Sequence, residues 1–180
     1  MALARELSGI KNIAVCAPKP KQVENLATAL TITEEPKYTK TELLKYILTE
    51  DGYTAIQKAL EDPNNELFTK NEFEPGASYY TVNIDPKYIR TVKDAPKVIF
   101  IDEITHFELA EIMALEAFAS KYNIKLMTSG DTLQKGSTKV GFNIESAFTF
   151  KNPRLTISAR TSRDTKKDNL TLLKDVLENC

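Results

Sequence analysis

The feature that most constrains this chain is a set of short runs rich in apolar residues, separated by stretches with helical spacing. The runs lie at residues 13–17, 98–101 and 124–127, and residues 155–157 form a shorter one. Runs of this length are typical of strands buried on both faces of a sheet. Strands that alternate with helices form a parallel sheet. We therefore predict an α/β fold with a parallel sheet flanked by helices.

Apolar residues at intervals of three and four predict the helices between these strands. The pattern is clearest at residues 107–119, and it recurs at residues 23–30 and 170–177. Residues 2–8 have the spacing of the end of a helix, which Gly9 would terminate.

Residues 31–95 are more polar and less regular in their apolar pattern than the flanking segments, and they are predicted to be an α+β insertion within one core. Residues 41–60 fit one or two polar helices, with Gly52 between them. Residues 62–76 contain Pro and Asn and are predicted to be a loop. Residues 79–84 alternate enough to form a strand.

The composition narrows the classes of function. A chain of 180 residues suits one domain, and its 24 Lys and Arg against 25 Asp and Glu give a net charge of −1. This balance excludes a strongly basic nucleic-acid arm and an acidic disordered tail, although a local patch can still bind nucleic acid. No apolar run approaches the roughly 20 residues that span a bilayer, so no membrane partner is expected. Cys16 and Cys180 lack the spacing of metal ligands, which favours a reduced, cytoplasmic location.

Polar residues follow the predicted strands at their carboxyl ends, where parallel sheets bind ligands. These residues are Pro18 and Lys19, Asp102 and Glu103, Gly130 and Asp131, and Arg160.

The adjacent carboxylates Asp102 and Glu103 can divide a task in phosphoryl transfer. One can hold Mg²⁺ through water, and the other can polarise a water molecule for attack on a phosphoryl group. The alternative is a solvated acidic turn at the start of the next helix, where negative charge is favoured. The neighbouring His106 has no second histidine with which to build a metal site, so it is expected in the first turn of that helix.

The residues after the later strands could also contact a phosphate. Asp131 accepts hydrogen bonds, and Gln134 can donate to a phosphate or hold a water molecule. Arg160 can stabilise charge on a transferring phosphoryl group, with Arg163 as a weaker candidate. The alternatives are an ordinary Gly-Asp turn with a surface glutamine, and a surface arginine paired with an acid.

Four segments carry a family resemblance when they are taken in order. Residues 17–26 resemble helicase motif Ia, residues 98–105 resemble motif II (the Walker B segment), residues 130–134 resemble motif III, and residues 155–162 resemble motif IV. Together they resemble the motor core of superfamily 1 DNA helicases. The resemblance covers residues 1–30 and 96–178, so residues 1–180 are expected to form a single partial motor domain.

This resemblance implies a P-loop NTPase (RecA-like) core that uses ATP and Mg²⁺. Asp102 would be the Mg²⁺-associated acid, and Glu103 the base that positions the attacking water. Gln134 would couple the γ-phosphate to the DNA site, Asp131 would contact the nucleotide, and Arg160 would be the arginine finger.

The resemblance also implies single-stranded DNA as a partner. Pro18, Lys19 and the start of the next helix would meet the DNA backbone. Lys19 occupies a position where the family usually has threonine.

The largest departure from the family is the phosphate-binding loop. A P-loop needs the pattern Gly-x-x-x-x-Gly-Lys-Ser/Thr, and none of the six glycines precedes a Lys-Ser or Lys-Thr pair. The chain is therefore expected to be a helicase fragment, inactive alone, that lacks its P-loop. The alternative is a non-catalytic nucleic-acid or protein-binding module derived from a motor domain. A receiver-like signalling domain would need acidic residues after the first strand, where Pro18 and Lys19 stand.

Overall fold

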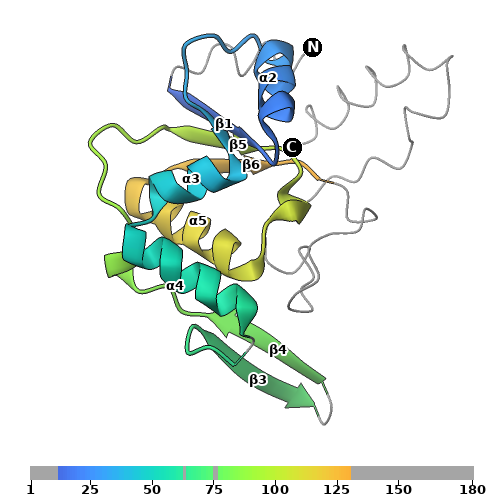
Figure 1. The fold of residues 1–180 in the computed structure, drawn as a ribbon, viewed down its shortest axis with the longest axis vertical. Coiled ribbons are helices and arrows are strands. Elements are labelled where there is room, and N and C mark those ends of the chain that lie inside the picture. Colours follow the sequence, from blue (N-terminus) through green and yellow to red (C-terminus); the bar gives the residue numbers. More distant parts are fainter. Residues whose placement is uncertain (1–11, 63, 75–76, 131–180) are drawn as a thin grey trace, which may run out of the picture.

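A computed structural model describes residues 12–62, 64–74 and 77–130 of the chain (Figure 1). The expected helices at 2–8 and 170–177 and the expected strand at 155–157 lie outside these residues.

The core is a four-stranded sheet in the order β2-β1-β5-β6. Its strands are β1 (Ile13–Ala17), β2 (Lys37–Thr39), β5 (Val98–Ile101) and β6 (Lys125–Thr128). All three pairings are parallel. The predicted parallel sheet is therefore confirmed, with the predicted strands 13–17 and 98–101 matching β1 and β5. The third predicted strand, 124–127, begins one residue later.

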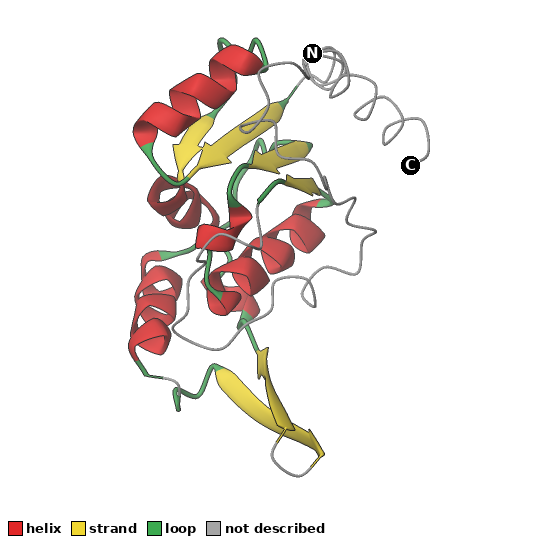
Figure 2. Cartoon of the chain, turned by 90° about the vertical axis from the view of Figure 1, so that its right-hand side faces the viewer, coloured by secondary structure: helices red, strands yellow, loops and turns green. Residues whose placement is uncertain are grey.

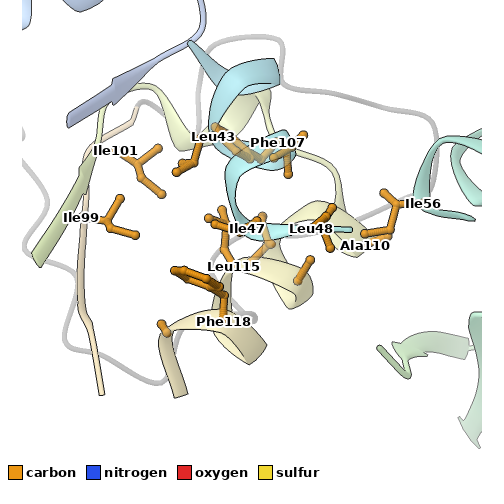
Figure 3. Packing of buried hydrophobic residues seen from close by; sticks show 14 of the residues in the cluster. Leu43, Ile47, Leu48, Ile56, Ile99, Ile101, Phe107, Ala110, Leu115 and Phe118 are labelled. Atoms are coloured by element: carbon orange, nitrogen blue, oxygen red, sulfur yellow. The ribbon is translucent and has the colours of Figure 1, made fainter. Parts of the chain in front are cut away.

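The two faces of the sheet are covered by different helices, which explains why β1 and β5 are wholly apolar. On one face, Ile13, Val15, Val98 and Phe100 pack with residues of α2 (Pro20–Ala29) and the segment after it. On the other, the alternate residues pack with α3 (Lys40–Ile47) and α5 (Leu109–Tyr122), and α4 (Glu50–Glu61) packs against these two helices in the same core. Side chains from β5 and these three helices point toward one another in Figure 3. Successive strand residues face opposite sides, so both faces need apolar side chains.

Helices α3 and α4 are separated at Leu48 and Thr49, so the predicted break at Gly52 is wrong. Thr49 caps α4, because its hydroxyl oxygen accepts a hydrogen bond from the Gly52 amide at 3.1 Å. Gly52 lies in the first turn of α4, where an added Cβ would come within 2.7 Å of the Tyr88 Cβ. This glycine therefore permits close packing inside a helix and does not end one.

The predicted loop at 62–76 is wrong at residues 68–74, which form a strand. β3 (Phe68–Glu74) pairs with β4 (Ala77–Val82) in an antiparallel hairpin, and the short helix η1 (Pro86–Tyr88) follows. The predicted strand 79–84 corresponds to β4, shifted by two residues. The hairpin projects away from the sheet, beyond α4 and α5 (Figures 1 and 2). Most residues of β3 are polar, so a search for apolar runs does not find this strand.

The described part of residues 31–95 shares the main core. This stretch supplies β2 to the sheet, and Leu43, Leu44 and Ile47 of α3 are at most 1% exposed. Its status as an insertion stays a prediction.

The helix predicted at 107–119 is α5, which begins two residues later. A short helix, η2 (Ile104–His106), precedes α5. Glu108 and Glu111 form a capping box at the start of α5. None of the helices in the described residues is long and apolar enough to cross a membrane.

Candidate functional site

The carboxyl ends of β1, β5 and β6 lie side by side, as the sequence predicts for a parallel sheet. Cys16 pairs with Ile101, which in turn pairs with Thr128. The Asp102 amide donates to the Cys16 carbonyl at 2.9 Å. The structure thus brings the segment of Pro18 and Lys19, the acidic pair and Gly130 to one edge. Asp131, Gln134 and Arg160 lie outside the described residues.

Asp102 is half-buried and is held by the segment that follows β6. The Ser129 hydroxyl donates to its Oδ1 at 2.5 Å. The backbone supports this contact, since the Ser129 amide donates to Ile101 O and the Ile104 amide donates to Ser129 O, both at 2.9 Å. Sequence reasoning gave Ser129 no role. Its position directly after a predicted strand could have placed it at the same edge of the sheet as the acidic pair.

Glu103 has a left-handed backbone, with φ 53° and ψ 49°. A non-glycine residue in this region costs about 1–3 kcal/mol, which the surrounding contacts must offset. Its Oε2 accepts a hydrogen bond from Gln22 Nε2 at 3.1 Å and lies 3.3 Å from His106 Nε2. About 31% of the Glu103 side chain is exposed, so the carboxylate can still meet solvent or a ligand.

Gln22 is the second residue that sequence reasoning missed. It lies in the first turn of α2, and its amide oxygen Oε1 is buried without a hydrogen-bond partner. An unsatisfied buried acceptor costs about 1–3 kcal/mol. No local pattern marks Gln22, because its partner Glu103 lies 81 residues away.

The N-terminal end of α2 has the properties of an anion-binding surface. Lys19 is the exposed N-cap, and Lys21 is exposed in the first turn. Lys19 makes no side-chain cap, and the first turn contains no acidic residue. Lysines and the positive end of a helix dipole both favour phosphate groups. Pro20 has no N–H, and the amides of Gln22 and Val23 both donate to the Lys19 carbonyl, so the lysines carry most of this preference here. Pro18 is half-buried and Pro20 occupies the first turn, so the entry into α2 is stiff.

Lys40, the first residue of α3, contacts both α5 and the segment that follows the acidic pair. Its Nζ lies 2.6 Å from Glu111 Oε2 and donates to the His106 carbonyl at 2.8 Å. Glu111 is only 2% exposed, and its Oε2 also accepts from the Glu108 amide at 2.8 Å. This network supports η2 and therefore the position of His106.

The Cys16 thiol, just before the edge, is unsuited to nucleophilic chemistry. Burial raises its pKa from 9.0 to about 12; the charge of Glu42 adds to this and that of Lys40 opposes it. A thiol with such a pKa stays protonated at neutral pH.

The donor set at this edge suits Mg²⁺ better than a transition metal. Among the described residues, no group of three or more His, Cys, Asp or Glu side chains could hold a metal ion. Mg²⁺ needs only one or two protein carboxylates, with water and phosphate oxygens as its other ligands. The Asp102 carboxylate can fill that role.

No protein-family model, curated protein or solved structure matches the chain.

Proposed function

We propose that this chain is part of the motor domain of an ATP-dependent DNA helicase with a P-loop NTPase (RecA-like) core. One observation carries the proposal: the acidic pair Asp102-Glu103 and the basic N-terminal end of α2 share one edge of a parallel sheet and are joined by the Gln22–Glu103 hydrogen bond. This arrangement suits a protein in which a phosphoryl-transfer site communicates with a nucleic-acid site. The proposal includes a cytoplasmic location.

In this proposal, Asp102 holds Mg²⁺, which supplies neutralising charge to the phosphates of ATP when it is bound. Glu103 accepts a proton from the water that attacks the γ-phosphoryl group. Asp131 contacts the nucleotide, Gln134 couples it to the DNA site, and Arg160 acts as the arginine finger.

The α2 end binds the sugar-phosphate backbone of single-stranded DNA. Lys19 contributes charge, and Pro18 fixes the direction in which the chain enters the helix. Contacts of this kind give affinity without sequence preference.

The residues present do not supply a cradle for the phosphates of ATP. The 180-residue sequence contains no Gly-x-x-x-x-Gly-Lys-Ser/Thr pattern. The proposal therefore assigns the phosphate cradle to chain outside this sequence, and the 180 residues alone are inactive.

Binding of single-stranded DNA tests the nucleic-acid part of the proposal. We expect fluorescence anisotropy to show a Kd between about 1 and 100 μM for a labelled oligothymidine. Lys19→Ala should weaken binding about fivefold and lower the salt slope by about one. Lys97→Ala is the matched control, because Lys97 is exposed at the opposite end of β5. No binding, or equal losses in the two variants, would contradict the proposal.

A second candidate function is a non-catalytic nucleic-acid or protein-binding module, which the missing P-loop pattern favours. ATP hydrolysis by the product of the complete reading frame separates the two. The helicase proposal expects DNA-stimulated turnover that falls at least about 100-fold in Glu103→Gln, since the amide cannot act as the base. DNA binding without any hydrolysis would favour the binding module. Hydrolysis that survives Glu103→Gln would overturn the role of Glu103.

A further inference from the structure

Ser129 is held beside the acidic pair by its backbone as well as by its side chain. Its amide donates to the Ile101 carbonyl, and its carbonyl accepts from the Ile104 amide, both at 2.9 Å. The next residue, Gly130, passes so close that an added Cβ would lie 3.2 Å from Ile104 Cγ2. Since the backbone fixes this segment, loss of the Ser129 hydroxyl alone would leave it in place.

The hydroxyl of Ser129 occupies only one of the two carboxylate oxygens of Asp102. It donates to Oδ1 at 2.5 Å. Within the described part of the chain, Oδ2 has no hydrogen-bond partner, and the side chain is half-buried. An ionised carboxylate can only accept, so Oδ2 keeps its lone pairs for water or a cation. The two oxygens of Asp102 are therefore not equivalent.

This difference between the oxygens affects which cation the carboxylate suits. Mg²⁺ requires nearly ideal octahedral geometry with short bonds, and the two oxygens of one carboxylate lie too close together for two neighbouring octahedral positions. Ca²⁺ has a flexible geometry and accepts a carboxylate through one oxygen or through both. A hydrogen bond that occupies Oδ1 is compatible with Mg²⁺ and removes one of the two modes open to Ca²⁺.

We propose that Ser129 is a positioning residue that makes Asp102 bind a cation through Oδ2 alone and thereby raises the selectivity for Mg²⁺ over Ca²⁺. The hydroxyl holds the carboxylate in one orientation before the cation arrives, as hydrogen-bond partners of metal ligands do. The inference rests on the proposed function, because that function assigns Mg²⁺ to Asp102.

The test compares Mg²⁺ and Ca²⁺ titrations of the 180-residue chain, read by NMR at the backbone amides of Glu103 and Gly130. Ser129→Ala removes the hydroxyl and keeps both backbone hydrogen bonds. Ser120→Ala is the matched control, since Ser120 is exposed on α5. Asp102→Asn identifies the shifts that depend on this carboxylate, because other acidic side chains also bind cations weakly.

We expect both cations to shift these amides in the unmodified chain and in Ser120→Ala, and neither to do so in Asp102→Asn. In Ser129→Ala, the Kd for Mg²⁺ should rise about tenfold, a usual effect of removing the partner of a metal ligand. The Kd for Ca²⁺ should change less than about threefold, because Ca²⁺ can then use both oxygens. A merely structural role of Ser129 would weaken both cations alike.

The hydroxyl proton of Ser129 provides a second readout, which decides the question if Ser129→Ala does not fold. In the unmodified chain, the hydrogen bond to Asp102 Oδ1 should slow exchange of this proton with water enough to give an NMR signal. The signal should persist at saturating Mg²⁺, because the cation binds the other oxygen.

The outcomes separate the role of Ser129 from the proposed function. An unchanged Kd for Mg²⁺ in Ser129→Ala, equal losses for the two cations, or a hydroxyl signal that is absent or disappears with Mg²⁺ overturns the role of Ser129 and leaves the proposed function standing. Shifts that persist in Asp102→Asn, or no binding of either cation by the unmodified chain, overturn the assignment of Mg²⁺ to Asp102. The role of Ser129 then falls with that assignment.

Discussion

Cys16 shows how burial alone can set the chemistry of a residue. It lies in β1, fully shielded from solvent, between a sheet neighbour on each side. The transfer of a thiolate into such a site is unfavourable, so burial raises the thiol pKa from 9.0 to about 12. In the unfolded chain the same thiol loses its proton near the ordinary pKa. The two states therefore bind different numbers of protons between pH 9 and 12.

The free energy of unfolding should fall as the pH rises through this window. The raised pKa in the folded state gives stability that is complete below pH 9 and is lost as the pH rises toward about 12. Denaturant titrations at pH 8, 9.5 and 11 should show a smaller loss in Cys16→Ala than in the unmodified chain. Tyr38 and Tyr46, whose pKa values are also raised by burial, contribute equally to both proteins. Parallel losses in the two proteins would refute the thiol's part.

At the scale of elements, the passage from β2 to α3 takes place without a loop. Thr39 is the last residue of β2 and the N-cap of α3. Glu42 Oε2 accepts from the Thr39 amide at 2.7 Å and from its hydroxyl at 2.8 Å, and the Glu42 amide donates back to the Thr39 hydroxyl oxygen at 3.4 Å. These bonds, the backbone one foremost, lower the pKa of Glu42 below 4.5. The capping box therefore fixes where the helix begins.

Thr39→Ala should reduce the free energy of unfolding by about 1 kcal/mol, the usual cost of losing an N-cap. The helix itself should persist, because its apolar side remains buried in the core. Thr41→Ala is the matched control, since Thr41 is an exposed residue in the first turn of the same helix. Urea titrations at pH 7 measure both changes. If Thr39→Ala cost no more than Thr41→Ala, the cap would contribute nothing.

The lowered pKa of Glu42 also predicts that the free energy of unfolding depends on pH in the acidic range. Because its folded-state pKa lies below 4.5, its contribution is present above that pH and is lost as the pH falls through the folded-state pKa. Thr39→Ala should therefore lose less stability than the unmodified chain when the pH falls from 6 to 3.

At the scale of the whole molecule, one ion pair ties the β2–α3 side of the fold to α5. Lys40 is 24% exposed and Glu111 only 2% exposed, and their charged atoms lie 2.6 Å apart. The Lys40 ammonium also lies 5.3 Å from the centre of the Phe107 ring. A buried carboxylate that loses its partner is costly, while the pair as a whole often adds little net stability.

Lys40→Met should therefore lower the free energy of unfolding by about 3–5 kcal/mol. The double variant Lys40→Met, Glu111→Gln should recover most of this loss, because glutamine is neutral and still accepts from the Glu108 amide. Glu111→Gln alone completes the double-mutant cycle, measured by urea denaturation. Additive losses in the double variant would contradict the pairing.

The sequence by itself determined the fold class, strands β1 and β5, and the approximate extent of α2 and α5. These features depend on local apolar runs and helical spacing, which any segment carries in itself. The sequence also predicted that Pro18, Lys19, Asp102, Glu103 and Gly130 would share one edge, because carboxyl ends of neighbouring parallel strands meet there. The roles of Asp131, Gln134 and Arg160 stay predictions.

Only the tertiary structure decided the contacts that complete the site. The partners in the Gln22–Glu103, Lys40–His106 and Asp102–Ser129 bonds are 81, 66 and 27 residues apart, so no local pattern predicts them. The three-residue strand β2 and the polar strand β3 were missed for the same reason, since each exists through pairing with a neighbour. Which side chains meet across the sheet depends on how distant segments of the chain fold together. Local propensity depends only on neighbouring residues, so it cannot predict these partners.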